Sequence, residues 1–313
     1  MSDVTAMPHP PFIAAGLDLG GTKIEAQIFD PSWTRVTFRR VPTPKTYEAL
    51  VAAMVDQIAW VESHVAGMPI GVAAAGLIHP TTGLALAANL PITGQAFPVD
   101  IAAAAGRAIL YLNDCRAQTL SEAQFGAAKG YASALCLNFG TGLAGGFVVG
   151  GALLPTALGL GGEFGHFALP AHVVQAHDLP IIGCGCGRVG CMETLLCGPG
   201  LARIVAHRTG RSLTAEEITA LKASDADIAH AWAIFCAVAA ELIHTLCLTL
   251  DPHCIVLAGG LSRAPGLVRD IRKAAIQSFL PGYEPPPLLL AEGGDATAAR
   301  GAAYAAFLEM GPE

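Results

Sequence analysis

Short apolar runs alternate along the chain with longer segments in which apolar residues recur every three or four positions. Short runs bounded by glycine or proline are typical of buried strands, and the longer spacing is typical of amphipathic helices. We predict strands at residues 13–19, 24–29, 70–74, 109–112, 132–139, 146–150, 254–258 and 288–291. We predict helices at residues 48–64, 101–108, 119–127, 227–249, 267–279 and 296–310, and a capping box with Thr214 as N-cap and Glu217 at N3. Strands interspersed with helices predict an α/β fold.

A strand, a glycine turn and a second strand occur at residues 13–29, and a similar unit recurs at residues 132–150. This weak internal repeat predicts two domains of related architecture. The length of 313 residues also suits two domains better than one.

The composition is that of a folded protein, with 53% hydrophobic and 14% charged residues. A net charge of −7 argues against a general nucleic-acid or anionic-membrane surface. It leaves room for an anionic ligand, because a glycine loop can hold phosphate without net positive charge.

The segment 231–250 is apolar enough to need a check for a membrane span. Glu241 and His244 interrupt it, and Asp251-Pro252 ends it as a helix stop, so we predict a buried core helix. Residues 1–11 lack the pattern of a signal peptide and are predicted to be a loose tail. Nine cysteines, an odd number, suit a reducing, cytoplasmic location better than a disulfide framework.

A histidine and three cysteines form the most distinctive cluster of the sequence: His166, Cys184, Cys186 and Cys191. One imidazole and three thiols are the right ligands, in the right number, for a closed tetrahedral zinc site. Four protein ligands leave no open position, so the predicted zinc is structural. Chance clustering in a cysteine-rich loop is the alternative.

Two glycine turns and a later glycine pair are candidates for a nucleotide site. The first turn contains Asp18, Gly20, Gly21, Thr22 and Lys23, the second contains Gly140, Thr141 and Gly142, and the pair is Gly259-Gly260. Glycines let backbone amides approach phosphate, while Asp18 is a candidate ligand for Mg²⁺. For each turn taken alone an ordinary turn is the alternative, and the three motifs together are a stronger signal than any one of them.

Three carboxylates are candidates for binding a sugar or for accepting a proton from its hydroxyl. Asp114 follows a predicted strand, where an aspartate can take the proton of an attacking hydroxyl; the alternative is that it caps the next helix. Glu163 and Glu193 bracket the predicted zinc ligands, so the metal would bring both near His166. Carboxylates commonly hold the hydroxyls of sugars, and the alternative is a pair of surface charges.

These motifs resemble those of the ROK family of sugar kinases and repressors. The resemblance runs from residues 18–23 (DLGGTK) to residues 294–307, and its most specific part is GEFGH at 162–166 followed by CGCGRVGCME at 184–193. Within the family, the long gap between His166 and Cys184 is most similar to bacterial N-acetylglucosamine kinases. The resemblance implies a two-lobed, actin-like (ribonuclease H-like) α/β fold with the active site between the lobes and the zinc loop in the larger one. It implies a smaller lobe of residues 12–115 plus 296–313 and a larger lobe of residues 116–295.

Residue by residue, the resemblance implies the following roles. Asp114 is the general base; Asn89, Asn113, Glu163, His166 and Glu193 contact the sugar; both glycine turns bind the phosphates of ATP; Gly259 and Gly260 lie near the adenosine; and His166, Cys184, Cys186 and Cys191 hold zinc. Ala75 and Arg116 stand at positions where the family usually has other residues. Neither change removes a group that the chemistry requires.

The sequence therefore predicts an ATP- and Mg²⁺-dependent kinase that phosphorylates the 6-hydroxyl of N-acetyl-D-glucosamine, with zinc helping to position the sugar. Kinases for N-acetylmannosamine, glucose or fructose are alternatives, as is a sugar-binding protein without catalysis. A repressor is disfavoured because about eleven residues precede the first strand, too few for a helix-turn-helix. The resemblance also implies a homodimer, whereas the cysteine usage and the net charge predict a cytoplasmic protein with no nucleic-acid or membrane partner.

Overall fold

The computed structural model describes residues 12–294 and 297–311, which fall into two compact units. Unit 1 comprises the described residues of Met1–Ser121, Ala157–Gly159 and Gly294–Glu313, and unit 2 comprises Glu122–Thr156 and Leu160–Gly293. Unit 1 is thus built from both ends of the chain. The predicted tail at 1–11 and Ala296, the first residue of the predicted last helix, lie outside the described residues.

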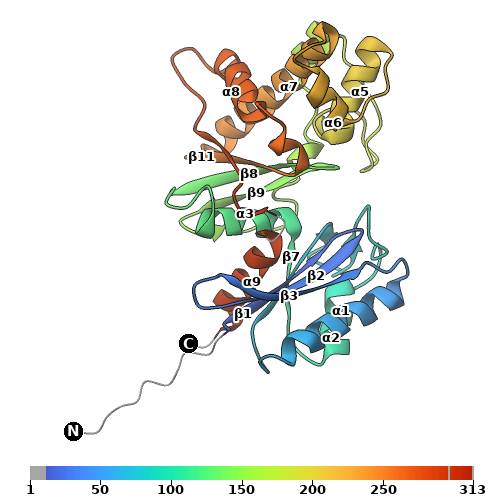
Figure 1. Ribbon diagram of the computed structural model, residues 1–313, viewed down its shortest axis with the longest axis vertical. Helices are drawn as coiled ribbons and strands as arrows, with labels where there is room; N and C mark the ends of the chain where they lie inside the picture. Colours follow the sequence, from blue (N-terminus) through green and yellow to red (C-terminus); the bar gives the residue numbers. More distant parts are fainter. Residues whose placement is uncertain (1–11, 295–296, 312–313) are drawn as a thin grey trace, which may run out of the picture. The chain divides into compact units, whose positions relative to one another are not determined.

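Unit 1 is built on a five-stranded sheet of order β3-β2-β1-β4-β7 (Figure 1). Its strands are β1 (Ala14–Leu19), β2 (Lys23–Phe29), β3 (Arg35–Pro42), β4 (Ile70–Ala74) and β7 (Leu110–Asn113). The first three are antiparallel, and β4 and β7 run parallel to β1. β5 (Leu77–Ile78) and β6 (Ala85–Leu86) form a separate small hairpin. The sequence did not predict β3, because this edge strand is only partly buried and has no continuous apolar run.

Helices cover both faces of this sheet. They are α1 (Tyr47–Glu62), α2 (Phe97–Ala105) and α9 (Thr297–Met310). A further helix, α3 (Asp114–Phe125), begins in unit 1, and its last four residues belong to unit 2. Leu17 and Leu19 of β1 share a core with α1, whereas Ala14 packs with Ala303 of α9. A Cβ on Gly16 would lie 1.8 Å from the carbonyl oxygen of Ala299, so glycine allows α9 to lie directly on β1. Figure 1 shows this last helix beside the first strand.

Unit 2 repeats the same sheet. Its order is β10-β9-β8-β11-β12, formed by β8 (Ser133–Phe139), β9 (Leu143–Val149), β10 (Ala152–Leu153), β11 (Cys254–Ala258) and β12 (Leu288–Leu290). The first three are antiparallel, and β11 and β12 run parallel to β8. The matching strand orders confirm the internal repeat and the predicted α/β fold.

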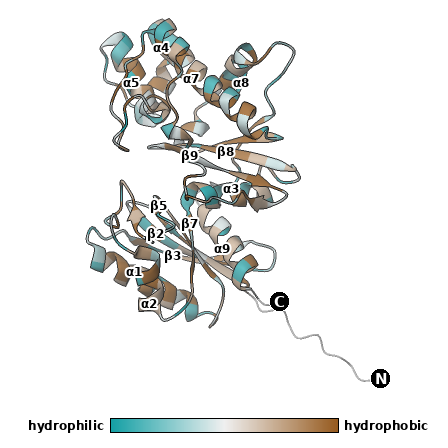
Figure 2. Ribbon diagram, turned by 180° about the vertical axis from the view of Figure 1, so that it is seen from behind, coloured by the Kyte–Doolittle hydropathy of each residue, from teal (hydrophilic) through white to brown (hydrophobic). Residues whose placement is uncertain are grey.

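The helices of unit 2 gather around α7 (Ala226–Leu250), which begins at the N-cap Asp225. The others are α4 (Ala171–His177), α5 (Gly198–Thr209), α6 (Ala215–Leu221) and α8 (Leu267–Ser278), with short 3₁₀ turns η1 (Phe164–His166), η2 (Met192–Thr194) and η3 (Gly260–Arg263). The predicted capping box of Thr214 and Glu217 is confirmed. Of the described helices, only α7 is long and apolar enough to cross a membrane; half of its most apolar stretch is buried in the unit. Contacts with α4, α5, α6 and α8 make it a core helix, as predicted (Figure 2).

Candidate functional site

The first glycine turn joins β1 to β2 and places the predicted nucleotide-binding residues of unit 1 together. The Gly20 N–H donates to the Lys23 carbonyl over 3.0 Å and closes the turn. Within the described part of the chain, the N–H groups of Gly21 and Thr22 donate to no protein acceptor. Asp18 lies one residue before the end of β1. Two adjacent amides near a strand end are suited to phosphate oxygens, and a carboxylate beside them suits Mg²⁺.

Two residues that the sequence analysis missed hold this turn from the other side. The Thr43 hydroxyl donates to the carbonyl of Gly20 over 2.6 Å, and its N–H donates to the carbonyl of Thr22 over 3.0 Å. Lys45 Nζ donates to the carbonyl of Gly21 over 2.9 Å. Three carbonyls are therefore fixed by Thr43 and Lys45. These residues follow β3, which the sequence did not predict, so no sequence signal connected them with the turn.

Asn89 also lies beside the first glycine turn. A Cβ on Gly21 would come within 3.3 Å of the Asn89 side chain and carbonyl oxygen. Asn89 belongs to the loop between β6 and α2. Its contact with the turn is compatible with the predicted sugar-binding role, which stays a prediction.

Asn113 and Asp114 lie at the same sheet edge as the turn. Parallel strands β1, β4 and β7 are neighbours, and Ala74 of β4 pairs with Asn113 of β7. Their carboxyl ends therefore meet at one edge, where ligands bind in open α/β sheets. Asn113 Nδ2 donates to the carbonyl of Gly76, in the loop after β4, over 3.2 Å.

Asp114 is the first residue of α3, and the pKa of its carboxylate is raised. One oxygen accepts the Cys115 N–H at 2.8 Å. Desolvation by its surroundings raises the pKa of Asp114 above 3.8, and the hydrogen bond from Cys115 only partly opposes this. The Tyr111 hydroxyl is buried without a hydrogen-bond partner in the described structure, and desolvation together with the Asp114 charge raises the pKa of this phenol. A carboxyl with a raised pKa at this sheet edge is suited to accept a proton.

The second glycine turn joins β8 to β9 in unit 2. The Gly140 N–H donates to the Gly142 carbonyl over 3.0 Å, and the Gly198 N–H donates to the Gly140 carbonyl over the same distance. Gly259 follows β11, the parallel neighbour of β8. Its φ is +85°, and a Cβ there would lie 2.4 Å from Asn138 Oδ1. Glycine is therefore required where this strand end meets the turn.

A cavity of about 910 Å³ opens next to these glycines. It is bordered by the second turn and by segments of α5, α6 and η3; its lining includes Gly140, Thr141, Ala202, Thr219 and Gly260. The cavity is large enough for a nucleoside. Two of the predicted nucleotide-binding sets, the second turn and the later glycine pair, thus border one cavity.

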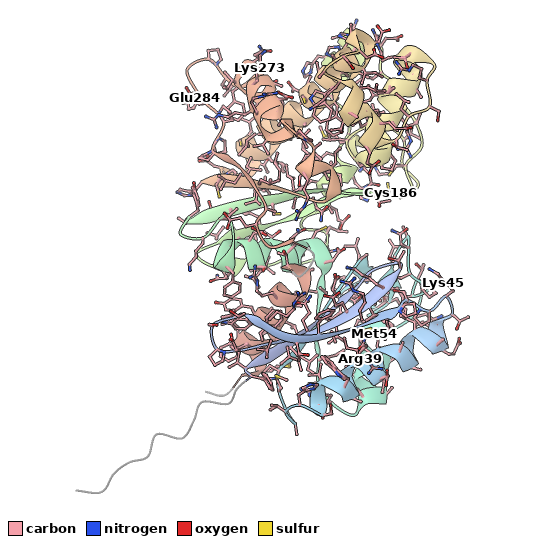
Figure 3. All side chains as sticks on the ribbon, in the orientation of Figure 1. Arg39, Lys45, Met54, Cys186, Lys273 and Glu284 are labelled. Carbon is pink, nitrogen blue, oxygen red and sulfur yellow. The ribbon has the colours of Figure 1, made fainter. Side chains whose placement is uncertain are left out.

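The four predicted zinc ligands converge in unit 2. Their ligand atoms, one each from His166, Cys184, Cys186 and Cys191, all lie within 4.8 Å of one another. Cys186 Sγ is 3.7 Å from Cys191 Sγ, and Cys184 Sγ is 3.7 Å from His166 Nδ1. Figure 3 labels Cys186, the exposed member of the set.

These distances fit zinc. Tetrahedral zinc with sulfur ligands at about 2.3 Å holds two thiolates about 3.8 Å apart. Desolvation raises the pKa of Cys191 to about 12, and its deprotonation thus calls for a cation. The Cys184 N–H donates to the Arg188 carbonyl over 2.8 Å, and Gly187, at φ +85°, completes the tight turn between ligands. Residues 183–191 are called the metal loop below.

Both predicted sugar-binding glutamates lie beside the metal cluster. His166 turns Nδ1 toward Cys184 and Nε2 toward Glu163, whose Oε2 is 3.6 Å away. Glu193 Oε2 accepts the Leu143 N–H over 2.9 Å, and its Oε1 lies 3.7 Å from Cys184 Sγ. A zinc ion on Nδ1 would leave Nε2 as the protonated nitrogen, able to donate to a carboxylate or a hydroxyl.

The duplicated sheets with a glycine turn in each first hairpin define a class of α/β protein that is well represented among solved structures. The ROK hexokinase of Thermus thermophilus superposes with a TM-score of 0.82 at 33% identity, over 94% of this chain and 98% of that one. A ROK family glucokinase from Streptomyces griseus, in complex with glucose and AMPPNP, gives a TM-score of 0.76 at 25% identity with the same coverage. The model of the ROK family matches residues 14–307. The chain belongs to the ROK family.

Two curated relatives match nearly the whole chain. N-acetylgalactosamine kinase AgaK of Shewanella sp. (strain ANA-3) is 35% identical over 292 residues, covering 92% of this chain and 94% of the relative. N-acetyl-D-glucosamine kinase of Yersinia enterocolitica is 34% identical over 297 residues, covering 92% and 97%.

Proposed function

We propose that this ATP-dependent sugar kinase transfers a phosphoryl group to the 6-hydroxyl of an N-acetylhexosamine, with N-acetyl-D-glucosamine as the first candidate. The observation that supports the reaction best is Asp114, a carboxylate of raised pKa at the carboxyl edge of the first sheet. The named relatives act on N-acetylhexosamines, which supports the class of acceptor.

Asp114 is proposed to accept the proton of the sugar hydroxyl as that oxygen attacks phosphorus. Its raised pKa lies closer to neutral pH, where a catalytic base must be ionised before the reaction and must still hold the proton that it accepts. Asn113 holds the Gly76 carbonyl and so orders the loop beside the base. Asn89, Asn113, Glu163, His166 and Glu193 are proposed to bind the sugar hydroxyls.

The two glycine turns are proposed to receive the phosphates, and the cavity bordered by Gly140 and Gly260 to receive the nucleoside. The amides of Gly21 and Thr22 would donate to phosphate oxygens, which stabilises charge on the transferred group. Asp18 is the residue proposed to hold Mg²⁺, which supplies charge neutralisation on the phosphates when bound. When bound by its four protein ligands, zinc would restrict the conformations of the metal loop.

N-acetylgalactosamine is a second candidate acceptor, because the relative that acts on it is 35% identical to this chain. The two sugars differ only in the orientation of the 4-hydroxyl. A coupled assay of ADP release should therefore compare kcat/KM for N-acetylglucosamine, N-acetylgalactosamine, N-acetylmannosamine, glucose and fructose. The proposal expects one of the first two sugars to lead by at least about tenfold, a difference of 1.4 kcal/mol in transition-state binding. A preference for glucose or fructose would overturn it.

The homodimer implied by the resemblance and the cytoplasmic location predicted from the cysteines remain predictions. Light scattering after size-exclusion chromatography tests the first.

A further inference from the structure

Glu193 lies between the metal loop and the second glycine turn. It comes two residues after the ligand Cys191, in η2. Oε2 accepts the N–H of Leu143, the first residue after the turn, over 2.9 Å. Its other oxygen is 3.7 Å from the ligand Cys184. One carboxylate therefore contacts a metal ligand on one side and the backbone of the turn on the other.

The fit around this carboxylate is tight. A Cβ on Gly142 would come within 2.5 Å of Glu193 Oε2, so this carboxylate lies directly against the turn. Gly165, the neighbour of the ligand His166, packs equally closely: a Cβ there would lie 2.2 Å from the Leu143 carbonyl oxygen and 3.1 Å from Glu193 Cβ. Small movements of Glu193 must therefore move the turn as well.

Backbone hydrogen bonds join the same two parts of unit 2. The Gly145 N–H of β9 donates to the Gly162 carbonyl over 2.8 Å, and the Gly198 N–H donates to the Gly140 carbonyl over 3.0 Å. Cys197 Sγ lies 3.1 Å from the carbonyl oxygen of Glu193. The segments that flank the metal ligands are thus the same segments that support the turn.

We infer that Glu193 is a positioning residue for the nucleotide: it transmits the order imposed by metal on residues 183–191 to the phosphate-binding turn at residues 140–142. The inference rests on the proposed function, in which this turn binds phosphate. The metal loop contains several glycines and packs little of its surface, so without metal it has many conformations available. When that loop is unrestrained, the Glu193 carboxylate is no longer held against Leu143. Metal then governs nucleotide affinity and not only the binding of sugar.

The first test separates hydrogen bonding by Glu193 from its charge. Glu193→Gln keeps a side-chain oxygen that can accept the Leu143 N–H, whereas Glu193→Ala does not. With ADP as the probe and no sugar present, calorimetry on the zinc-loaded protein should show at least about tenfold weaker binding for Glu193→Ala and no more than about threefold for Glu193→Gln. Glu284→Ala is the matched control, because that carboxylate is exposed in the same unit and should leave ADP affinity unchanged.

The second test reads the turn directly. Hydrogen exchange of the amides in residues 139–145 should accelerate in Glu193→Ala, and in the wild type after zinc is removed with a chelator and its loss verified by metal analysis. Unchanged exchange and unchanged ADP affinity in the zinc-free wild type would overturn the inference. If Glu193→Ala fails to fold, ADP affinity and hydrogen exchange measured on Glu193→Gln and on the zinc-free wild type still test the inference. A wild type that binds no ADP refutes the proposed function, whereas exchange at these amides still decides whether the link exists.

Discussion

Asn113 and Asp114 are neighbours at the end of β7, yet they make different hydrogen bonds to the first turn of α3. Asn113 Oδ1 accepts the N–H groups of Cys115 and Arg116, at 3.0 and 3.2 Å, and so caps α3. Asp114 accepts only the Cys115 N–H of these two. The capping role that the sequence left open for Asp114 thus falls mainly to Asn113. The Asp114 carboxylate is instead hydrogen-bonded by Cys115 and by its own backbone N–H, and its desolvation outweighs these bonds.

Asp114→Asn should lower kcat by at least about 10³-fold, because an amide cannot accept the hydroxyl proton and orients the acceptor poorly. A steady-state assay with saturating sugar and ATP measures this loss. Circular dichroism and ADP affinity should stay as in the wild type, since Asn keeps the size of the side chain. Turnover within about tenfold of the wild type would contradict the role of base.

The raised pKa of Asp114 has two consequences for pH dependence. On acidification, kcat/KM should be lost with an inflection that lies above pH 3.8, the ordinary pKa of this carboxyl. The folded state also holds the proton more tightly than the unfolded chain. The stability that this group contributes is therefore complete below pH 3.8 and is lost as pH rises through the folded pKa. Asp114→Asn should accordingly melt at a higher temperature than the wild type at pH 7, with a difference that shrinks toward pH 3.8. A lower melting temperature at pH 7 would contradict the desolvation.

Asn113→Ala should destabilise the protein by about 1 kcal/mol, the usual cost of losing an N-cap. Urea denaturation measures the change in the free energy of unfolding. Asn113→Ser is the control, because its hydroxyl can still accept a helix amide and should recover most of that loss. Equal losses in both variants would show that the bond to the Gly76 carbonyl matters more than the cap.

The sequence predicted most of what decides the fold. Continuous apolar runs located β11 and β4 to the residue, and the repeated strand–glycine–strand pattern predicted that the two sheets would match. β3 was not predicted because edge strands bury little surface, so the sequence of β3 contains no continuous apolar run. The start of α3 was predicted five residues late, since its first turn is polar and its cap, Asn113, was assigned to the sugar.

The candidate site was predictable where ligand chemistry fixes residue type. Cysteine and histidine at zinc spacing predicted the cluster of His166, Cys184, Cys186 and Cys191, whose ligand atoms the structure brings within 4.8 Å of one another. Contacts made through the backbone were not predictable. Thr43 and Lys45 bind the carbonyls of the first turn, and Glu193 binds the N–H of Leu143. Backbone groups are present at every position, so a sequence gives no sign of which ones a side chain will reach.

Ala202→Phe should raise the KM for ATP by at least about tenfold with little change in the KM for sugar. Ala202 lines the cavity beside the second turn, and a phenyl ring there takes space that a nucleoside needs. Ala206→Phe is the control, because Ala206 lies on the same helix, is exposed and lies outside the cavity lining. A rise in the KM for ATP in both variants, or in neither, would place the nucleoside elsewhere.

Gly71→Ala should destabilise the protein by about 3 kcal/mol, because it separates α9 from the first sheet. A Cβ at this position of β4 would lie 2.0 Å from the carbonyl oxygen of Ala302, and backbone cannot move aside as a flexible side chain can. Gly67→Ala is a matched control: its φ of +76° costs about 1 kcal/mol for any L-residue, but a Cβ there meets nothing within 4 Å. Urea denaturation of both variants separates steric overlap from backbone strain. Similar losses in the two would mean that α9 adjusts its position freely, and that small residues along β1 and β4 are not what holds the two ends of the chain together.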